Sequence, residues 1–380
     1  MIKKVIAFLV VAAMLLTAAA CAAPAAAPAA EAAPAEEGGS KAFPARSADE
    51  LKFGFIYIGN PGDMGYTYAH DQGRLEMEAA TGVKSVIVED VPENADCEKA
   101  IHDLIYQGCN VIVANSFGYL DFVAECAEQN PDIIFLHCSG YKSGPNFANY
   151  FGRVYQPRYL SGIVAGLNTK SNKIGYVAAM PIPEVTRGVD AFALGVKSVN
   201  PDATVEVIWT NTWFDMAVEK SAALELINHG CDVVTQHQDS PAAMIACEEK
   251  GIFGIGYNAD MSASAPNAFL CAPRFNWGTY YKAAAQQIID GTWTNAPYWG
   301  GMAEDAVYLT DLSDKCAEGT KEAVEAAKAK IESGELCIFE GPLNDNEGNE
   351  KVAAGVKMTD AEMLSVDWFV DNVIGSVPKA

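Results

Sequence analysis

The sequence predicts an α/β protein built from two Rossmann-like lobes, each with its own parallel sheet. Three observations support this fold class. The length of 380 residues is sufficient for two domains. Short apolar strands alternate with helices along most of the chain, which is typical of parallel sheets covered on both faces. The order of these segments in residues 50–150 is repeated in residues 155–265.

The repeat consists of matching strands and helix ends. The strand KFGFIYIG from Lys52 corresponds to KIGYVAAM from Lys173. LIYQGCNVIVANS from Leu104 corresponds to LINHGCDVVTQHQ from Leu226, and in both a helix ends at a glycine before a β-branched strand. A helix and then a strand follow in each half, in FVAECAEQNPDIIFLH from Phe122 and MIACEEKGIFGIGY from Met244. Each half therefore predicts the order β-α-β-α-β-α-β.

The domain boundaries follow from this repeat. We expect an N-terminal lobe over residues 47–153 and a C-terminal lobe over residues 154–271, each completed by part of residues 272–380. The last region contains a helix rich in Ala, Lys and Glu, KEAVEAAKAKIESG from Lys321, and an amphipathic stretch, AEMLSVDWFVDNVIG from Ala361. We expect these segments to cross back and complete the lobes.

The first 46 residues have the composition of a targeting signal and a tether. Residues 1–20 combine two lysines, an apolar run too short to span a bilayer and a small-residue stretch that ends at Cys21. Residues 21–46 are almost wholly Ala, Pro, Glu, Gly and Ser, which cannot bury enough apolar surface to fold. The pattern resembles a bacterial lipoprotein signal, which implies lipidation of Cys21 and a location on the extracytoplasmic face of the cell membrane. Ordinary secretion is the alternative.

Charge and cysteine content narrow the classes of ligand. The 49 acidic and 26 basic residues give a net charge of −23, which disfavours nucleic acids and highly phosphorylated ligands. The nine cysteines beyond Cys21 form no CxxC pair and no Cys/His cluster with metal spacing, so we expect no metal site. Several lie in apolar runs and are interpreted as small buried hydrophobic residues.

The usual signatures of catalysis are missing from the sequence. It contains no GxGxxG, no GxxxxGK[ST], no GxSxG and no HExxH. His237 and Asp239 are close enough in sequence to suggest an acid/base pair, but that coincidence is common. An exported nucleoside hydrolase would need a cluster of metal-binding aspartates, which is also missing. We expect neither an enzyme nor a cofactor.

Candidate ligand-binding residues lie where strands lead into loops. In open α/β sheets ligands bind outside the carboxyl ends of the strands, and two facing lobes place two such sets of loops on opposite walls of one cleft. Aromatic rings alternate there with amides and carboxylates, which suits stacking on an aromatic heterocycle and pairing with its edge. The candidates are Tyr66, Tyr68, Asn115, Phe117, Glu184, Trp213, Asp239 and Asp260.

Several of these aromatic residues also have a purely structural interpretation. Strands in covered sheets are apolar throughout, which favours a core position for Tyr57, Trp209 and Phe117. Asp215 is suited to cap a helix, with Trp213 packed beneath it. His70 is suited to the face of its own helix.

The loops at these strand ends resemble those of a known family. The signal, the tether and the duplicated lobes are similar to type I periplasmic binding proteins, whose two lobes are joined by a hinge. The loops GDMGYTYAHDQGR, NSFGY, PIPEVTRG, VIWTNTWFD and TQHQDS resemble those of the BMP (basic membrane protein) lipoproteins. Members of this family are substrate-binding subunits of ABC importers and bind purine bases or purine nucleosides.

The resemblance implies roles for particular residues. In the loop from Asp63 to Thr67, Tyr66 takes the place of the aromatic residue that stacks on the base. Trp213 matches a second family aromatic from the other lobe, Asp260 falls near an aspartate that holds ribose, and Arg274 falls near a family lysine. The first loop and TQHQDSPAA are more similar to the subgroup that binds free bases.

These points predict a lipid-anchored, monomeric receptor that captures a purine, a free base such as adenine above all, and delivers it to an ABC permease. In this interpretation the ring lies between Tyr66 and Trp213, and Asn115, Glu184 and Asp239 pair with its edge. Alternatives are a purine nucleoside receptor, a sugar receptor of the same fold, and a co-receptor that presents its ligand to a membrane sensor.

Overall fold

A computed structural model of the chain describes residues 41–379. The predicted signal segment, Cys21 and most of the predicted tether lie outside the described residues. A search of the helices within 41–379 finds none with both the length and the hydropathy needed to cross a bilayer. The described residues, 41–379, belong to a single compact unit.

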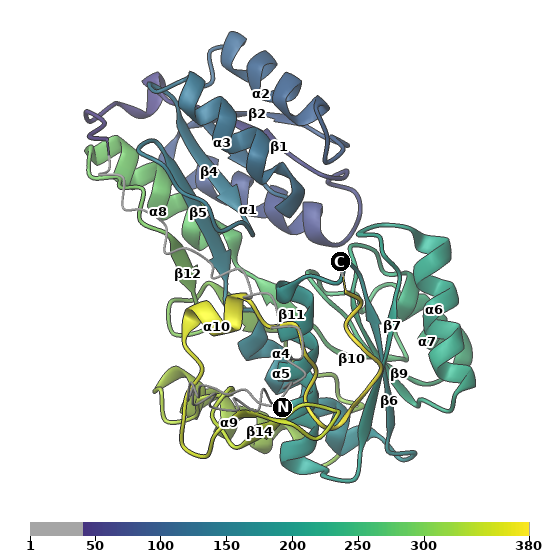
Figure 1. The fold of residues 1–380 in the computed structure, drawn as a ribbon. Helices are drawn as coiled ribbons and strands as arrows, with labels where there is room; N and C mark the ends of the chain where they lie inside the picture. The colour runs from purple at the N-terminus through teal and green to yellow at the C-terminus, as the bar shows by residue number, and fades with distance from the viewer. Residues whose placement is uncertain (1–40, 380) are drawn as a thin grey trace, which may run out of the picture. The chain divides into compact units, whose positions relative to one another are not determined.

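The first sheet has the strand order β12-β5-β4-β3-β1-β2, and all of its pairings are parallel (Figure 1). Five of its strands come from the first half of the chain, and β12 is added from the last region. The strands are β1 (Lys52–Ile56), β2 (Lys84–Val88), β3 (Val111–Ala114), β4 (Ile134–Cys138), β5 (Phe147–Gly152) and β12 (Tyr298–Gly300).

Alternate residues of the central strands supply two separate cores, because successive side chains of a strand point to opposite faces. Val111 and Val113 belong to one core, and Ile112 and Ala114 belong to the other. The first face is covered by α1 (Tyr66–Thr81) and α8 (Trp277–Asp290), which pack together. The second is covered by α2 (Asp96–Tyr106) and α3 (Leu120–Gln129).

The second sheet has the order β10-β9-β8-β6-β7-β16 with parallel pairings throughout; five of its strands repeat the order of the first sheet, whereas β16 joins the opposite edge from β12. Helices α4 and α5 pack on one face, and α6 and α7 pack on the other. The elements are β6 (Lys173–Ala178), β7 (Thr204–Trp209), β8 (Val233–His237), β9 (Phe253–Ile255), β10 (Phe269–Cys271), β16 (Val373–Ile374), α4 (Tyr155–Asn168), α5 (Pro183–Val199), α6 (Met216–Asn228) and α7 (Ala242–Lys250).

Two glycines allow α4 and α5 to pack closely. A Cβ atom on Gly162 would lie 2.0 Å from the carbonyl oxygen of Phe192, and one on Gly195 would lie 2.0 Å from that of Tyr159. Any larger residue at either position would force the two helices apart. Because Glu184 lies in the first turn of α5, this contact also fixes one wall of the site described below.

Within residues 41–379 the chain passes between the two sheets three times. The passages are the residues between β5 and α4, the strand β11 (Pro273–Phe275) and the strand β13 (Val307–Leu309), and β11 and β13 pair in antiparallel fashion. After the last passage α9 (Thr320–Glu332) packs on α4. Three passages of this kind are the connections through which two lobes can rotate relative to each other.

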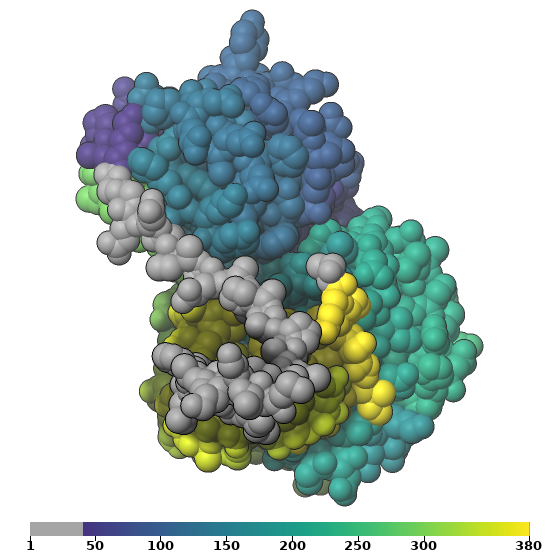
Figure 2. Space-filling model, in the orientation of Figure 1, coloured from purple at the N-terminus to yellow at the C-terminus, as the bar shows by residue number. Residues whose placement is uncertain are grey.

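The C-terminal region ends in a short helix and an added strand. The amphipathic stretch expected from Ala361 forms α10 (Asp360–Leu364) and then β16, which pairs with β7. Figure 2 shows these last described residues, in yellow, at the surface alongside the second lobe. A hairpin of β14 (Leu343–Asn344) and β15 (Glu350–Val352) precedes them. Short 3-10 helices are η1 (Ala48–Glu50) and η2 (Phe117–Tyr119).

The structure confirms the predicted fold class and the predicted duplication. The orders β5-β4-β3-β1-β2 and β10-β9-β8-β6-β7 are the same when the strands of each half are numbered from one. The nine cysteines in the described part of the chain are unpaired; seven are buried and two are partly buried, as expected for small hydrophobic residues.

Candidate ligand-binding site

A pocket lies at the carboxyl ends of the strands, where loops from both halves of the chain meet. It is narrow, with a volume of about 20 Å³, and it opens into a hollow of about 540 Å³. The pocket and the hollow share Ile58, Trp213 and Asp239. The full lining of the pocket is Ile58, Tyr66, Ser116, Phe117, Ser139, Glu184, Trp213, His237, Asp239 and Tyr257.

The loop after β1 is organised by one carboxylate. Asp63 accepts hydrogen bonds from the backbone N–H groups of Gly65 (2.8 Å), Thr67 (2.8 Å) and Tyr68 (2.9 Å). These amides belong to the start of α1, where backbone donors have no partner inside the helix. Asp63 therefore fixes the direction of the first turn of α1, which carries Tyr66.

The ring of Tyr66 is held on the pocket wall by its hydroxyl and by its neighbours. The hydroxyl donates to the backbone carbonyl of Asn115 and lies 3.5 Å from Sγ of Cys138. The ring of His70 meets it edge to face, with centroids 4.4 Å apart. One end of the tyrosine is thus fully bonded, and the ring lines the pocket.

The opposite wall is provided by the loop before α6. Asp215 caps this helix by accepting from the backbone N–H groups of Ala217 and Val218, both at 3.0 Å. The structural interpretation of Asp215 is therefore confirmed. Trp213, two residues earlier, lines both the pocket and the hollow, and its carbonyl accepts from the N–H of Asp239 at 3.1 Å.

Loops from the two halves touch at a glycine. A Cβ atom built on Gly65 would lie 2.2 Å from the carbonyl oxygen of Asp239, closer than any real Cβ contact. Only glycine allows the two backbones to approach this closely. The contact brings the aromatic residue of the first loop next to the carboxylate that follows β8.

A connected set of polar side chains lies at the base of the pocket. Ser139 donates to Oε2 of Glu184, and Oε1 of the same carboxylate lies 3.4 Å from Nε2 of His237. The hydroxyl of Tyr257 is 3.2 Å from the same imidazole nitrogen. Ser139 follows β4 of the first lobe, whereas Glu184, His237 and Tyr257 belong to the second.

The pocket is acidic, and burial opposes charge on its titratable groups. Burial, followed by the nearby carboxylates Asp63, Glu219 and Glu184, raises the pKa of Asp239 well above its ordinary value. Burial lowers the pKa of His237 to about 4, although Glu184 opposes this shift. The His237 imidazole is therefore neutral near pH 7, and its contact with Glu184 is a hydrogen bond and not an ion pair.

Cations lie behind the pocket wall and do not line it. The guanidinium of Arg158 is 3.9 Å from the ring centroid of Tyr257 and donates to the carbonyl of Gln236 at 2.8 Å. Arg187 donates to the carbonyl of Met363 at 2.6 Å. Both side chains are buried. The residues that line the pocket therefore offer mostly hydrogen-bond acceptors and ring faces.

The structure brings five of the predicted residues together and places four elsewhere. Tyr66, Phe117, Glu184, Trp213 and Asp239 all line the pocket. Asn115 is buried behind it, where Oδ1 accepts from the N–H of Ile58 at 3.0 Å. Tyr68, Asp260 and Arg274 do not line it; Asp260 is exposed, and Arg274 donates to the carbonyl of Asn258 and lies over the ring of Tyr308.

Five lining residues were not among the predicted set: Ile58, Ser116, Ser139, His237 and Tyr257. Each lies at or just after the end of a parallel strand, which is the position that the strand-end rule selects. Tyr57 is buried in the core, as its structural interpretation predicted, and His70 on α1 is buried as well. His70 stacks on Trp277 with ring centroids 4.3 Å apart.

Comparison with known proteins finds one matching family model and similar relatives over most of the chain. Residues 51–358 match the family model Bmp, described as ABC transporter substrate-binding protein, PnrA-like. A purine-binding protein of Brucella abortus is 40% identical over 337 residues, covering 88% of this chain and 96% of the relative. A protein of Haloferax volcanii is 36% identical over 325 residues, covering 86% of this chain and 81% of the relative. Its name describes it as a candidate glucose-binding protein of an ABC transporter.

Solved structures with the same fold include solute-binding proteins of ABC transporters. One from Conexibacter woesei aligns with a TM-score of 0.64 at 21% identity, over 75% of this chain and 97% of that protein. Another, from Aeropyrum pernix, aligns with a TM-score of 0.68 at 19% identity, over 75% of this chain and 92% of that protein. At these identities the likeness concerns the fold alone.

Proposed function

Because the chain belongs to the PnrA-like (Bmp) family of ABC transporter substrate-binding proteins, we propose that it captures a purine, with a free base such as adenine as the preferred ligand. Proteins of this family bind a solute outside the cytoplasm and pass it to a membrane permease; they are not enzymes. The observation that carries the proposal is that Tyr66, Trp213, Glu184 and Asp239 line one narrow pocket.

The proposed position of the ring is between Tyr66 and Trp213. Both side chains are partly buried and line the pocket, one from each half of the chain. The hydroxyl of Tyr66 is already bonded to the carbonyl of Asn115, so its ring face is the part that remains for a ligand. Stacking of a base on an aromatic side chain contributes about 1–3 kcal/mol. Phe117 adds an apolar contact from the same lobe as Tyr66.

The edge of the ring would meet carboxylates. Glu184 and Asp239 offer acceptors, and free purines carry N–H groups that donate to them. Among the described residues, no side-chain donor is bonded to the carboxylate of Asp239, so a ligand N–H would supply the hydrogen bond that this buried group lacks. The 40% identity to a purine-binding protein also supports this class of ligand.

The hollow outside the pocket bears on the size and charge of the ligand. Its lining includes four carboxylates, which disfavour phosphorylated ligands; they are Asp63, Asp90, Glu93 and Asp239. The inner pocket holds little more than a water molecule at about 20 Å³. A ring therefore enters only when the two walls separate, which the three passages between the sheets permit.

A sugar is the second candidate, and the relative assigned to glucose binding favours it. Aromatic rings also stack on sugars. A nucleoside would place its ring in the pocket and its ribose in the hollow; Asp260 and Arg274 line neither, so they would contact ribose only after a rearrangement of the walls. The absence of arginine and lysine among the described pocket residues favours the flat heterocycle over the sugar.

Isothermal titration calorimetry of the ligand-stripped protein with adenine, guanosine, ribose and glucose tests the proposal. Saturable heat from adenine, and weaker or no heat from the two sugars, is expected. Binding of glucose or ribose without binding of any purine would overturn it. A purine nucleoside that binds more tightly than adenine would correct the preference for the free base and keep the ligand class.

We also propose that Cys21 is lipidated and anchors a monomeric receptor to the outer face of the cell membrane. The small-residue run before Cys21 and the low-complexity segment after it support this proposal. Metabolic labelling with a radioactive fatty acid would mark the parent protein. Labelling that persists in Cys21→Ser would contradict the anchor without affecting the assignment of the ligand.

A further inference from the structure

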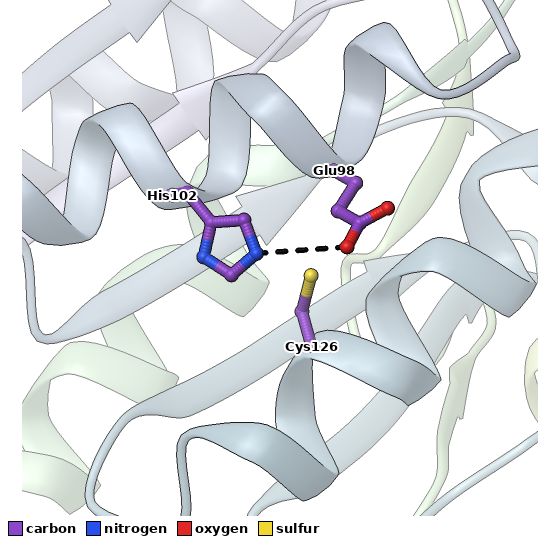
Figure 3. A group of neighbouring side chains, drawn as sticks. All are labelled: Glu98, His102 and Cys126. Atoms are coloured by element: carbon purple, nitrogen blue, oxygen red, sulfur yellow. Dashed lines mark ion pairs between the residues drawn. The ribbon is translucent and has the colours of Figure 1, made fainter.

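A group of side chains on the outer face of the first lobe has the composition of a metal site. Figure 3 shows Glu98 and His102 on α2 and Cys126 on the neighbouring helix α3, all directed toward one point. We propose that these three residues bind a divalent transition-metal ion of the zinc type. Nothing in the proposed capture of a purine requires this site, because none of the three residues lines the pocket.

The spacing of the three donor atoms suits a small ion. Nε2 of His102 lies 3.7 Å from Oε1 of Glu98, and these two atoms and Sγ of Cys126 all lie within 4.8 Å of one another. Ligands of a tetrahedral zinc ion lie about 3.3–3.7 Å apart, given metal–ligand bonds of about 2.0–2.3 Å. Binding therefore requires the sulfur and the other two donors to approach by about 1.5 Å at most.

The surroundings of the donors allow this adjustment. The side chains of His102 and Glu98 are 46% and 39% exposed, so both are able to rotate without disturbing the core. They are four residues apart on α2 and therefore lie on the same face of the helix. Cys126 is buried among the apolar residues of the α2 and α3 face and provides the fixed ligand.

The donor set indicates which metal fits. Imidazole, thiolate and carboxylate together suit zinc or cobalt and do not suit magnesium or calcium, which prefer oxygen ligands. Three protein ligands leave the fourth tetrahedral position for water, which the exposed side of the cluster can supply. Glu125, next to Cys126, adds negative charge on α3.

The expected consequence is a link between two helices. Glu98 and His102 belong to the helix that follows β2, and Cys126 belongs to the helix that follows β3. A bound ion would tie α2 to α3 and stabilise the first lobe, by an amount that grows with the logarithm of the free ion concentration above its Kd. Because binding displaces a proton from the cysteine, the affinity for the ion is expected to increase with pH.

The test uses Co²⁺ as a spectroscopic probe of the full chain, kept reduced and free of other metals. The parent protein is expected to give a thiolate-to-cobalt absorption band at one equivalent, together with the visible absorption of tetrahedral cobalt, and Zn²⁺ is expected to displace both. Cys126→Ser removes the thiolate. His102→Gln changes an exposed residue, so it tests the site even if Cys126→Ser fails to fold. Cys109→Ser and His229→Gln are matched controls outside the cluster.

Loss of the band in both Cys126→Ser and His102→Gln, with the band kept in both controls, supports the site. A zinc-dependent rise in the melting temperature of the parent that is lost in His102→Gln supports it further. Absence of a thiolate band from the parent, or an unchanged band in either cluster variant, overturns the proposal. Adenine titrations of the same samples report separately on the purine pocket.

Discussion

His237 and Glu184 face each other in the wall of the pocket, with 3.4 Å between Nε2 of the imidazole and Oε1 of the carboxylate. A contact of this kind between exposed groups would be an ion pair. Here burial lowers the pKa of His237 to about 4, and the tyrosine hydroxyl of Tyr257 shares the same nitrogen. The pair therefore joins two elements of the second lobe through a neutral histidine.

The neutral state of His237 predicts that the folded protein loses stability in acid. The histidine has a pKa near 6.5 in an unfolded chain, so between about pH 6.5 and 4 the unfolded state binds more protons and the free energy of unfolding decreases as pH falls. His237 contributes up to roughly 1.4 kcal/mol per pH unit in that window. Urea unfolding at several pH values is expected to give a shallower dependence for His237→Asn. Equal slopes in parent and variant would contradict the prediction.

Asp239 predicts that ligand binding, like the stability linked to His237, increases with pH. The pKa of its carboxyl is raised in the free protein, and a ligand N–H that donates to the carboxylate favours the charged form. Binding of adenine is therefore expected to release protons and to tighten as pH rises. Calorimetry in two buffers of different ionisation enthalpy measures that release.

Asp239→Asn is the matched variant for this prediction. It is expected to weaken adenine binding by about 1.5–3 kcal/mol, because a hydrogen bond to a charged acceptor is lost, and to abolish proton release. Removal of a buried acid is also expected to stabilise the free protein near pH 7. Tighter binding by the parent as pH falls would show that the protonated acid is the form that meets the ligand.

Trp213→Ala tests the second wall of the proposed stack. Loss of about 1–3 kcal/mol of stacking lowers the affinity for adenine roughly 5- to 150-fold. Trp209→Phe is the control, because Trp209 stacks on Phe369 with centroids 6.0 Å apart and does not line the pocket. Calorimetry that finds the same affinity in Trp213→Ala and parent would remove the stack from the mechanism.

Tyr66 allows the ring and the hydroxyl to be separated. Tyr66→Phe keeps the ring and leaves the carbonyl of Asn115 without its partner, so we expect a loss of about 1 kcal/mol in unfolding free energy with little change in affinity. Tyr66→Ala removes the ring and is expected to abolish measurable binding. If Tyr66→Phe binds as poorly as Tyr66→Ala, the hydroxyl and not the ring face is the important group.

The close contact between Gly65 and the backbone of Asp239 predicts that a larger residue at position 65 would keep the two walls of the pocket apart. Gly65→Ala would place a Cβ atom 2.2 Å from the carbonyl of Asp239, so the walls are expected to stay apart and the affinity to fall by at least about tenfold. Gly62→Ala lies in the same loop and meets only the side chain of Asn60, at 3.0 Å, which makes it a suitable control. Small-angle scattering with and without adenine would report whether ligand compacts the parent more than Gly65→Ala.

The strand-end rule explains how much of the site was predictable. It selected Tyr66, Glu184, Trp213 and Asp239, which the structure places in one pocket. It also selected Asn115, whose side chain instead bonds the N–H of Ile58 behind the pocket. The rule identifies the edge of the sheet on which a residue lies, but the direction of its side chain depends on neighbours that are distant in sequence.

Local signals in the sequence predicted the two parallel sheets, the repeated order of strands and helices along the chain and the loops that form the site, because apolar periodicity and glycine stops report burial and chain reversal. The order of the strands within each sheet was known only from the structure. Which side chains meet depends on how distant segments of the chain pack together. Ser139 and Glu184 are joined by a hydrogen bond between the two halves of the chain. Glu98, His102 and Cys126 converge because two helices pack on the same face of a sheet, and no spacing in the sequence records that distance.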